Sequence, residues 1–382
     1  MSSRTLHPRL SSLSAWSTVA VAAALFAGLL VGLLPCIARA ADPTPAPRDW
    51  SQNPAIVELD IPINVDVYAI GDPHADYARL IDLLVKGDII NHVSNKPDQL
   101  GNVTWKAGNA VLVCTGDMID KSVNSVEVLQ LFMRLRNIAP DAGGKVIVTM
   151  GNHEAEFLAN PTVTNTKAAE FLAQLKRMKD AGVTNIDPAM VGNGTDSLGL
   201  GQFLRSLPFA ARVNDWFFAH AGNTNSKNPD KATSPRSLAA LGSFLQTDVT
   251  ANGYGGESLS KSNSLLEAKL DSPWWEEKGD SGQASEDRLR KYVTALGSGI
   301  KHLVIGHQPG KVKFNGEETR EKGVMVGRYF GGIIFLIDCG MSSGVNYSTG
   351  ALLRIRPHEV YSIHFEGNVR KEDLLMGQIA VM

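Results

Sequence analysis

The sequence predicts an α/β fold in which strands and helices alternate. Short apolar runs bounded by Gly occur five times along the chain, a pattern typical of buried strands. The first two runs are each followed by apolar residues at helical spacing, as in a helix that packs on a sheet. Each run also ends at an Asp, Asn or His, and open α/β sheets bind ligands at the carboxyl ends of their strands. The sequence therefore predicts a polar site along one edge of a buried sheet.

Composition indicates a globular protein without a nucleic-acid partner. The chain has 382 residues, of which 43% are hydrophobic and 20% charged, enough for one large domain with insertions. Its formal net charge of −2 falls to about −5 without the first forty residues, whose only charged side chains are Arg4, Arg9 and Arg39. Because no basic stripe remains, we expect no nucleic-acid binding.

The N-terminal forty residues have the pattern of a secretory signal peptide. No charged residue lies between Trp16 and Ile37, and Ala38-Arg39-Ala40 forms a small-x-small cleavage site. We therefore expect cleavage between Ala40 and Ala41, a secreted or periplasmic location, and a Pro-rich mature N-terminus over 41–60. The alternative is an uncleaved anchor, since the apolar run is long enough to span a bilayer. Such an anchor is the only membrane contact that we expect.

The first half of the chain predicts strand, loop and helix in turn. VYAIGDPHAD (67–76) is followed by Tyr77, Leu80, Ile81 and Leu84, the buried stripe of a helix. VLVCTGDMID (111–120) contains a strand over 111–116, and a helix is expected at about 123–137, before Pro140 and the Gly pair at 143–144. A third apolar run, VIVTMGNHE, covers 146–154.

Two insertions are expected to cover the site. The first, about 155–203, predicts one helix at about 166–180 and then a Gly-, Asn- and Thr-rich tract to Gly201. The second, about 223–285, predicts helical pieces around 236–247 and 262–270 with a hydrated loop, ANGYGG, between them. Because both insertions leave from loops that carry candidate ligands, they should shape substrate entry.

The remaining elements complete a domain predicted over 61–370, with a tail over 371–382. The runs WFFAHAG (216–222) and LVIGHQPG (303–310) supply two more strands, and Arg288 to Gly297 predicts an amphipathic helix. Strands between Gly331 and Phe365 should pack as a second sheet. Cys114 and Cys339 lie in predicted core strands, so we expect two buried free thiols and no disulfide.

Six candidate metal ligands close or follow the apolar runs. They are Asp72, His74, Asp117, Asn152, His220 and His307. Oxygen ligands mixed with imidazoles suit a pair of divalent or trivalent ions, whereas a structural zinc would favour thiolates in a closed tetrahedron. Mn, Fe and Zn all accept such ligands, so the sequence predicts hydrolytic chemistry with two of these ions.

The five segments, in this order, resemble the motifs of the calcineurin-like metallophosphoesterases. Within that family the chain is most similar to the Shewanella-like phosphatases, a branch of phosphoprotein-phosphatase type. RSLPFAARVNDWFFAHAG (205–222) and IDCGMS (337–342) support this branch, and the resemblance covers roughly 60–356. It implies a sandwich of two mixed β-sheets flanked by helices, with helical insertions over the metal site.

The resemblance also implies roles for individual residues. Asp72 and His74 would bind the first metal and Asp117 would bridge both, with Asn152, His220 and His307 on the second. A metal-bridging hydroxide would attack a phosphate monoester. His153 would protonate the leaving group, and Asp120 would orient the His153 imidazole. Glu154 is expected to hold its loop in place, and Asp338 is either a site residue or a structural one.

The chain departs from the family pattern at three places. Ala75 replaces the usual Gly, which a loop without positive φ would tolerate. Lys121 and Ser122 replace an Arg-Gly pair, so Lys121, with Asn152, is the candidate phosphate ligand. Relatives also place an Arg after a Trp in the second insertion, where this chain reads SPWWEEKGD (272–280) and offers Lys278 instead.

The expected substrate is a phosphorylated protein, at Ser/Thr or Tyr, or a small phosphoester. One alternative keeps the metals but changes the substrate to a nucleotide, a diadenosine polyphosphate or a phosphodiester. A second alternative is a non-catalytic binding module on the same fold. The second is disfavoured because all six ligands and the acid are present in the sequence.

Overall fold

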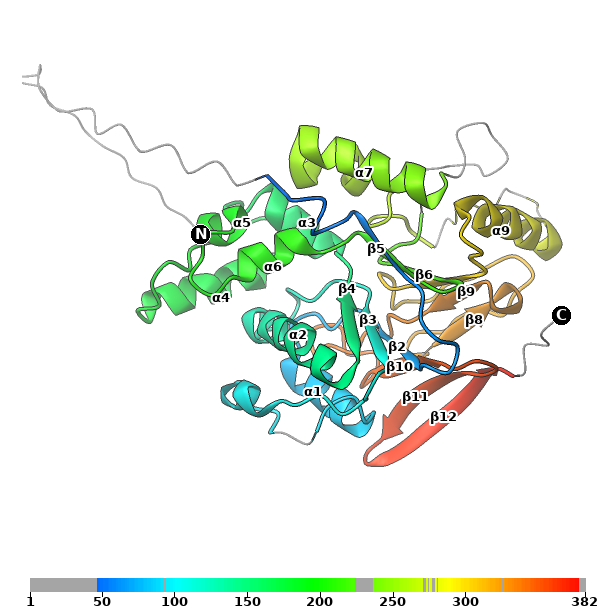
Figure 1. Ribbon diagram of the computed structural model, residues 1–382, viewed down its shortest axis with the longest axis horizontal. Coiled ribbons are helices and arrows are strands. Elements are labelled where there is room, and N and C mark those ends of the chain that lie inside the picture. The colour runs from blue at the N-terminus through cyan, green and yellow to red at the C-terminus, as the bar shows by residue number, and fades with distance from the viewer. Residues whose placement is uncertain are drawn as a thin grey trace, which may run out of the picture. The chain divides into compact units, whose positions relative to one another are not determined.

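The computed structural model describes residues 47–377, apart from 92–93, 224–235, 271–272, 274, 277–278, 280 and 325. All elements named below belong to the compact unit Pro43–Met382 (Figure 1). The expected signal peptide and Lys278 lie outside the described residues. In the part of the chain that is described, no helix is long and apolar enough to cross a membrane.

Two mixed sheets of six strands each form the centre of the fold. The first sheet contains, in spatial order, β1 (Ile56–Leu59), β5 (Ala210–Val213), β6 (Trp216–Ala219), β7 (His302–Ile305), β9 (Ile334–Leu336) and β8 (Gly327–Tyr329). The second contains β12 (Val369–Met376), β11 (Val360–Glu366), β10 (Ala351–Ile355), β2 (Val67–Ile70), β3 (Val111–Cys114) and β4 (Lys145–Val148). The predicted fold class is confirmed.

Each sheet contains three neighbouring parallel strands that end at the same edge. In the second sheet β2, β3 and β4 run parallel, and in the first sheet β6, β7 and β9 do so. Every residue of β2, β3, β6 and β7 is buried, as expected for strands covered on both faces. The parallel order brings together the loops that follow these strands, and these loops carry the candidate ligands.

Nine α-helices of the described chain cover or extend the sheets. They are α1 (Tyr77–Lys86), α2 (Ser125–Ile138), α3 (Asn152–Ala159), α4 (Ala169–Asp180), α5 (Pro188–Asn193), α6 (Leu200–Ser206), α7 (Leu238–Asn252), α8 (Glu257–Ser260) and α9 (Gly282–Leu296). Figure 1 shows α1 and α2 beside the β2–β4 strands and α9 beside β6 and β9. Helix α1 buries the four predicted apolar residues, and its first turn is capped by the Asp76 carboxylate, which accepts from the Arg79 N–H.

The first insertion is more helical than its composition predicted. Helix α4 corresponds to the expected helix at about 166–180, but α5 and α6 lie in or overlap the tract predicted to be irregular. Helix α5 begins at an Asp-Pro pair, a local signal for the start of a helix: the Asp187 carboxylate accepts from the Met190 N–H, and Pro188 occupies the first helical position.

The helix predicted over 262–270 is absent from the structure, and this expectation was wrong. The Ser264 hydroxyl donates to the Leu259 carbonyl at 2.8 Å and accepts from the N–H groups of Leu266 and Glu267 at 3.2 and 3.1 Å. Such side-chain bonds compete with the hydrogen bonds of a helix, so the segment forms turns. The ANGYGG segment is also not a hydrated loop throughout, because Tyr254 is buried and its hydroxyl donates to the Arg205 carbonyl.

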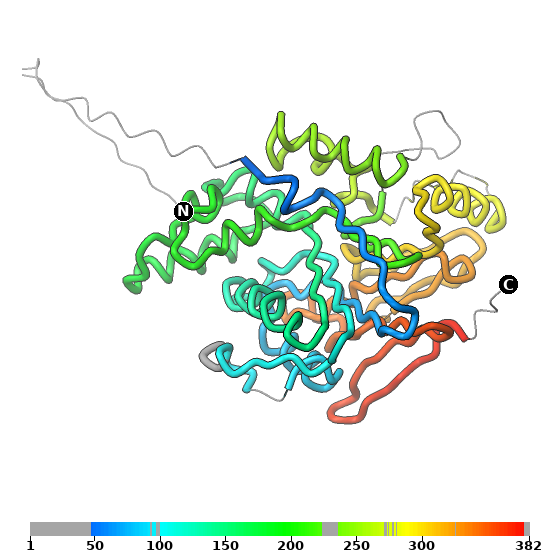
Figure 2. Tube along the Cα trace, viewed as in Figure 1, coloured from blue at the N-terminus to red at the C-terminus, as the bar shows by residue number. Residues whose placement is uncertain are grey.

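The C-terminal strands do not form a sheet of their own, contrary to the prediction. Strand β9 joins β7 in the first sheet, whereas β10 pairs antiparallel with β2 and extends the second sheet. Both sheets also use residues outside 61–370. Strand β1 pairs with β5, and β12 pairs with β11 past residue 370. In Figure 2 the N-terminal segment, in blue, runs beside green segments of the chain.

Cys114 and Cys339 are buried free thiols, as expected. Cys114 ends β3, but Cys339 follows β9 instead of lying within a strand. Burial raises the pKa of Cys339 to about 11, so this thiol stays protonated and packs as a small apolar group.

Candidate metal centre

The candidate metal centre lies where the carboxyl ends of the two parallel strand triplets meet. Asp72 follows β2, Asp117 follows β3 and Asn152 begins α3 after β4, while His220 and His307 follow β6 and β7. Two hydrogen bonds join the sheets here. The His307 N–H donates to Asp72 Oδ2 at 2.8 Å, and His220 Nδ1 lies 3.0 Å from the Thr115 carbonyl.

Two groups of ligand atoms share the Asp117 carboxylate. One group contains His74, Asp117 and His153, the other contains Asp117, His220 and His307, and the atoms of each group lie within 4.8 Å of one another. Asn152 is next to the second group, with its Oδ1 3.3 Å from His220 Nε2. The shared carboxylate matches the bridging position expected for Asp117.

The positions of Asp72 and His153 relative to the two groups differ from the expected assignment. Asp72 Oδ2 lies 3.8 Å from His220 Nδ1, so this residue stands between the two sets of strands, outside both groups. His153, expected only as the acid, reaches to 3.8 Å from Asp117 Oδ2. The structure thus brings all the predicted ligands together, and their assignment to individual metals stays a prediction.

Backbone carbonyls orient two of the imidazoles. His74 Nδ1 lies 3.1 Å from the Ile119 carbonyl, and His220 Nδ1 makes the equivalent contact with Thr115. A carbonyl only accepts, so in both rings Nδ1 carries the proton and Nε2 keeps its lone pair. The Nε2 atoms of both rings lie 3.5 Å from Asp117 Oδ2, which is the arrangement that metal ligation requires.

The protonation states also suit metal binding. Burial lowers the pKa of His74 to about 3 and lowers the pKa values of His220 and His307 below their usual range. Burial would raise the pKa of Asp117, but the His220, His153 and His74 imidazoles outweigh it and lower this pKa. Neutral imidazoles around an ionised carboxylate are the ligand forms that bind cations.

Unpartnered carboxylate oxygens provide the test of whether cations fit. Asp72 Oδ1 and Asp338 Oδ2 are buried, and neither accepts a hydrogen bond from the described residues. Burial, with the nearby charges of Asp338 and Asp117, raises the pKa of Asp72 well above its usual value. A cation would supply the compensating charge that buried carboxylates need. The residues present therefore fit two oxygen- and nitrogen-coordinated metal ions.

The ligand loops adopt left-handed backbone conformations. Non-Gly residues at positive φ in these loops are His74 (40°), Ala75 (58°), Asp117 (48°), Asp120 (68°), Lys121 (59°) and His307 (69°). The loop at Ala75 has positive φ and so does not meet the condition under which Ala would replace Gly without strain. Ala at a left-handed position costs about 1–2 kcal/mol, and such strain is found where a site must aim its side chains.

Glu154 holds the Asp117 loop in place, as expected. Its carboxylate accepts the N–H groups of Asp117 at 2.9 Å, Met118 at 2.7 Å and Ile119 at 3.1 Å, and also that of Gly151 at 2.8 Å. These bonds join the loop after β3 to the start of α3. The position of the shared Asp117 carboxylate therefore depends on a residue that lies outside both ligand groups.

His153 and Asp120 form the pair expected for an acid and its orienting carboxylate. His153 Nδ1 lies 3.5 Å from Asp120 Oδ2, while Asp120 Oδ1 accepts the Glu170 N–H at 2.7 Å. Burial would lower the pKa of His153, but the Asp117 and Asp120 carboxylates outweigh it and raise this pKa. The His153 ring therefore holds a proton more firmly than the neighbouring imidazoles do.

Two lysines lie near the candidate metal centre, one that the sequence predicted and one that it did not. Lys121 Nζ lies 2.9 Å from His74 Nε2, which places the predicted phosphate ligand at the site. The sequence did not predict Lys167, which pairs with Glu267, while Glu267 Oε1 also accepts from Asn152 Nδ2 at 3.2 Å. No local motif marks Lys167 or Glu267, since each comes from a different insertion and only the fold brings them together.

Trp275 and Asp338 are both buried, and their contacts indicate structural roles. Trp275, from the segment where an Arg was expected, is fully buried against Phe314 at a centroid distance of 5.3 Å. Asp338 follows β9, its Oδ1 accepts the Gly340 N–H at 2.9 Å, and burial raises its pKa to about 6. Asp338 thus provides a second buried carboxylate whose charge acts on Asp72.

Comparison with known proteins places the chain in a family. Residues 65–320 match the calcineurin-like phosphoesterase family, and the chain belongs to it. Shewanella-like protein phosphatase 1 of Plasmodium berghei is 24% identical over 316 residues, which cover 78% of this chain and 74% of that protein. An uncharacterized protein of Schizosaccharomyces pombe is 37% identical over 98 residues, or 26% of this chain and 27% of that protein. The second match therefore spans only about a quarter of each protein.

Solved structures agree on the fold. The cold-active protein-tyrosine phosphatase of a psychrophilic Shewanella species superimposes with a TM-score of 0.57 at 21% identity, covering 84% of this chain and 82% of that chain. The predicted resemblance is confirmed. With its family, its phosphatase relatives and its candidate ligand groups, this protein is a metal-dependent phosphoric ester hydrolase.

We predict that Glu154→Gln weakens metal binding about 10- to 100-fold, the usual effect of losing a residue that orients metal ligands. The amide turns a donor toward backbone N–H groups and loosens the Asp117 loop. Equilibrium dialysis with metal analysis measures this change. Glu156→Gln is the control. The Glu156 carboxylate lies on the same helix but accepts from the Lys167 N–H instead of from the Asp117 loop. Equal metal affinity in both variants would contradict the role of Glu154.

Proposed function

We propose that this protein is a two-metal phosphatase that hydrolyses phosphate monoesters on phosphorylated proteins. The observation that carries the proposal is the pair of ligand groups that share Asp117, with the His153–Asp120 pair at their edge. The similarity to a Shewanella-like protein phosphatase over most of both chains supports a protein substrate. The phosphorylated residue would be Ser/Thr or Tyr.

Two metal ions bound here would lower the pKa of a shared water and neutralise charge on the phosphate. The protein residues would do the remaining work. Asp117 fixes the spacing of the two sets of ligands, and Lys121 adds positive charge next to His74. His153 gives its proton to the departing oxygen, and the Asp120 carboxylate keeps the ring oriented during that transfer.

A substrate panel tests the proposed function. We expect the metal-loaded protein to release phosphate from p-nitrophenyl phosphate and from phosphoserine, phosphothreonine or phosphotyrosine peptides. Nucleotides, diadenosine polyphosphates and phosphodiesters should be hydrolysed more slowly. Asp117→Asn should remove all turnover, because the shared carboxylate loses its charge, while circular dichroism shows an intact fold. Turnover by Asp117→Asn, or a preference for a nucleotide, would refute the proposal.

The leaving group tests the role of His153. We predict that His153→Ala lowers kcat by about 10²- to 10⁴-fold for a phosphoserine peptide, the range for losing a general acid. p-Nitrophenyl phosphate should lose much less, since p-nitrophenolate leaves without protonation. Steady-state kinetics on both substrates gives the comparison. Equal losses on the two would remove His153 from the acid role.

We also propose that the enzyme is exported and acts outside the cytoplasm. The uncharged run from Trp16 to Ile37 and the Ala38-Arg39-Ala40 site support this location. Mass spectrometry of the protein purified from a host with a Sec pathway should find Ala41 at the N-terminus. A mature chain that retains residues 1–40 in the cytoplasmic fraction would contradict export.

A further inference from the structure

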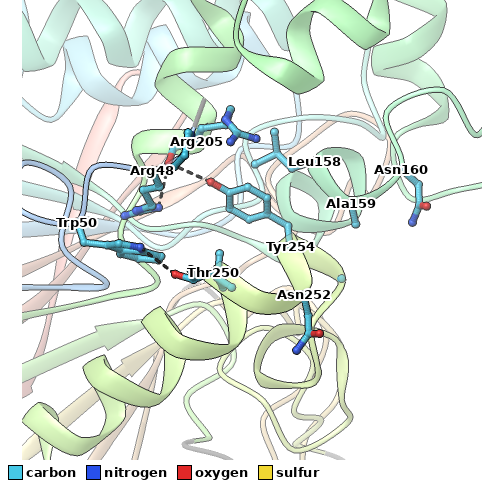
Figure 3. A pocket seen from close by; sticks show the side chains of 13 residues that line it. Arg48, Trp50, Leu158, Ala159, Asn160, Arg205, Thr250, Asn252 and Tyr254 are labelled. Atoms are coloured by element: carbon cyan, nitrogen blue, oxygen red, sulfur yellow. Dashed lines mark hydrogen bonds between the residues drawn. The ribbon is translucent and has the colours of Figure 1, made fainter. Parts of the chain in front are cut away.

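A cavity of about 580 Å³, here called the strap basin, opens beside the N-terminal segment of the described chain. Figure 3 shows residues that line it: Arg48 lies next to the Trp50 indole and Arg205 above the Tyr254 ring, with Asn160 on the opposite side. Four segments that are far apart in sequence build this basin, namely the segment at 47–50, the end of α3, Arg205 on α6, and 249–255 at and after the end of α7.

The strap basin adjoins the metal centre. A second hollow of about 240 Å³ is lined by the candidate ligand Asn152 and by Glu156 and Glu267. The two hollows share four lining residues, which are Ala159, Asn160, Tyr254 and Gly255. The two hollows therefore lie next to each other along α3, which offers a substrate bound at the metals a route toward the strap basin.

Helix α3 sets the length of this route. It runs from Asn152 at the metal centre to Ala159 at the strap basin. At a rise of about 1.5 Å per residue, these two positions are about 10 Å apart along the helix axis. An extended peptide covers about 3.3–3.6 Å per residue, so about three residues bridge this distance. The strap basin is thus within reach of a side chain three positions from a phosphorylated residue.

The strap basin is positively charged on an acidic protein. Its described lining residues include two guanidinium groups and no carboxylate. Arg48 lies over the Trp50 ring at 4.6 Å and Arg205 over the Tyr254 ring at 5.6 Å. The formal net charge of the chain is −2, so this concentration of positive charge is local.

Two nearby carboxylates, Asp49 and Asp248, are not among the residues that line the strap basin. Asp49 Oδ1 accepts from the Ser51 N–H and hydroxyl, and Asp248 accepts from the Ser258 N–H at 2.7 Å. The Arg48 guanidinium donates to five backbone carbonyls, including Leu207 at 2.8 Å and Asn53 at 2.9 Å. Arg48 therefore stays fixed in place and contributes its charge to the strap basin.

We propose that the strap basin is a substrate subsite that binds an acidic side chain about three residues from the phosphorylated residue of a phosphoprotein. This inference rests on the proposed function. A carboxylate there would be attracted by the positive charges of Arg48 and Arg205 next to the rings, and its peptide backbone would lie against Asn160 and the Tyr254 ring. The same charge disfavours a basic side chain at that position.

Nonapeptides with one phosphorylated residue test the subsite. Asp, Ala or Lys is placed three residues before or three residues after the phosphorylated residue. One of these two positions, before or after the phosphorylated residue, should reach the strap basin. In that series we expect kcat/KM to be about fivefold higher for Asp than for Ala, the size of one partly exposed ion pair, and lowest for Lys. Identical values for the three residues on both sides would overturn the subsite.

Blocking the passage between the two hollows gives a second test. Asn160→Trp should remove the preference for Asp and lower kcat/KM for the nonapeptides much more than kcat/KM for p-nitrophenyl phosphate. Gln246→Trp, on α7 but not among the residues that line the strap basin, is the matched control and should change neither. Gly255→Phe gives an independent block if Asn160→Trp does not fold, because an added Cβ there meets Ala159 Cβ at an ordinary 3.5 Å.

The outcomes separate the subsite from the proposed function. An unchanged preference for Asp in a folded blocking variant would overturn the subsite while phosphatase activity remains. Failure of the metal-loaded wild-type protein to hydrolyse both p-nitrophenyl phosphate and the nonapeptides would instead refute the proposed function. Loss of preference in the blocking variants alone supports the strap basin as the place where the acidic residue binds.

Discussion

The charge of the Asp117 carboxylate, held in a buried position, is the constraint on which the rest of the site depends. Its Oδ2 lies 3.5 Å from the Nε2 atoms of His74 and His220 and 3.8 Å from that of His153. Three imidazoles from different strand ends therefore face a single oxygen. A buried carboxylate is costly unless opposite charge or hydrogen bonds compensate it. The ligands converge on this oxygen, and Glu154 fixes the loop that carries it.

Helix α3 connects the parts of the protein that we assign to different tasks. Its first turn carries Asn152, His153 and Glu154, and so it supplies a candidate ligand, the proposed acid and the residue that holds the Asp117 loop. Its other end lines the strap basin. Because a helix is stiff over two turns, the metal centre and the basin are held at a fixed separation. Reaction and substrate choice would thus share one rigid element.

The backbone of the ligand loops limits which residues the site tolerates. Several non-Gly residues in the loops after β2, β3 and β7 have positive φ, and the loops are close to neighbouring backbone. At Gly151 an added Cβ would collide with the Asp117 N–H and carboxylate, and at Gly71 it would collide with the Ile337 carbonyl. Ala75 shows that a small side chain is accepted at one such place. The strain is maintained by the packing of the two sheets.

The sequence by itself determined the strand ends, most of the helices and the candidate residues of the metal centre, because a short buried apolar run and the polar residues shortly after it form a local pattern. It missed features that depend on distant contacts. Ser264 replaced a predicted helix by turns through its own hydrogen bonds, and β10 paired with β2 across the chain. The Lys167–Glu267 pair and the strap basin join segments from separate insertions. Side chains that can bind metals are recognised from a short stretch of sequence. Strand pairing, the backbone strain at Ala75 and the contact between the two insertions depend on packing between distant segments, which only the tertiary structure decided.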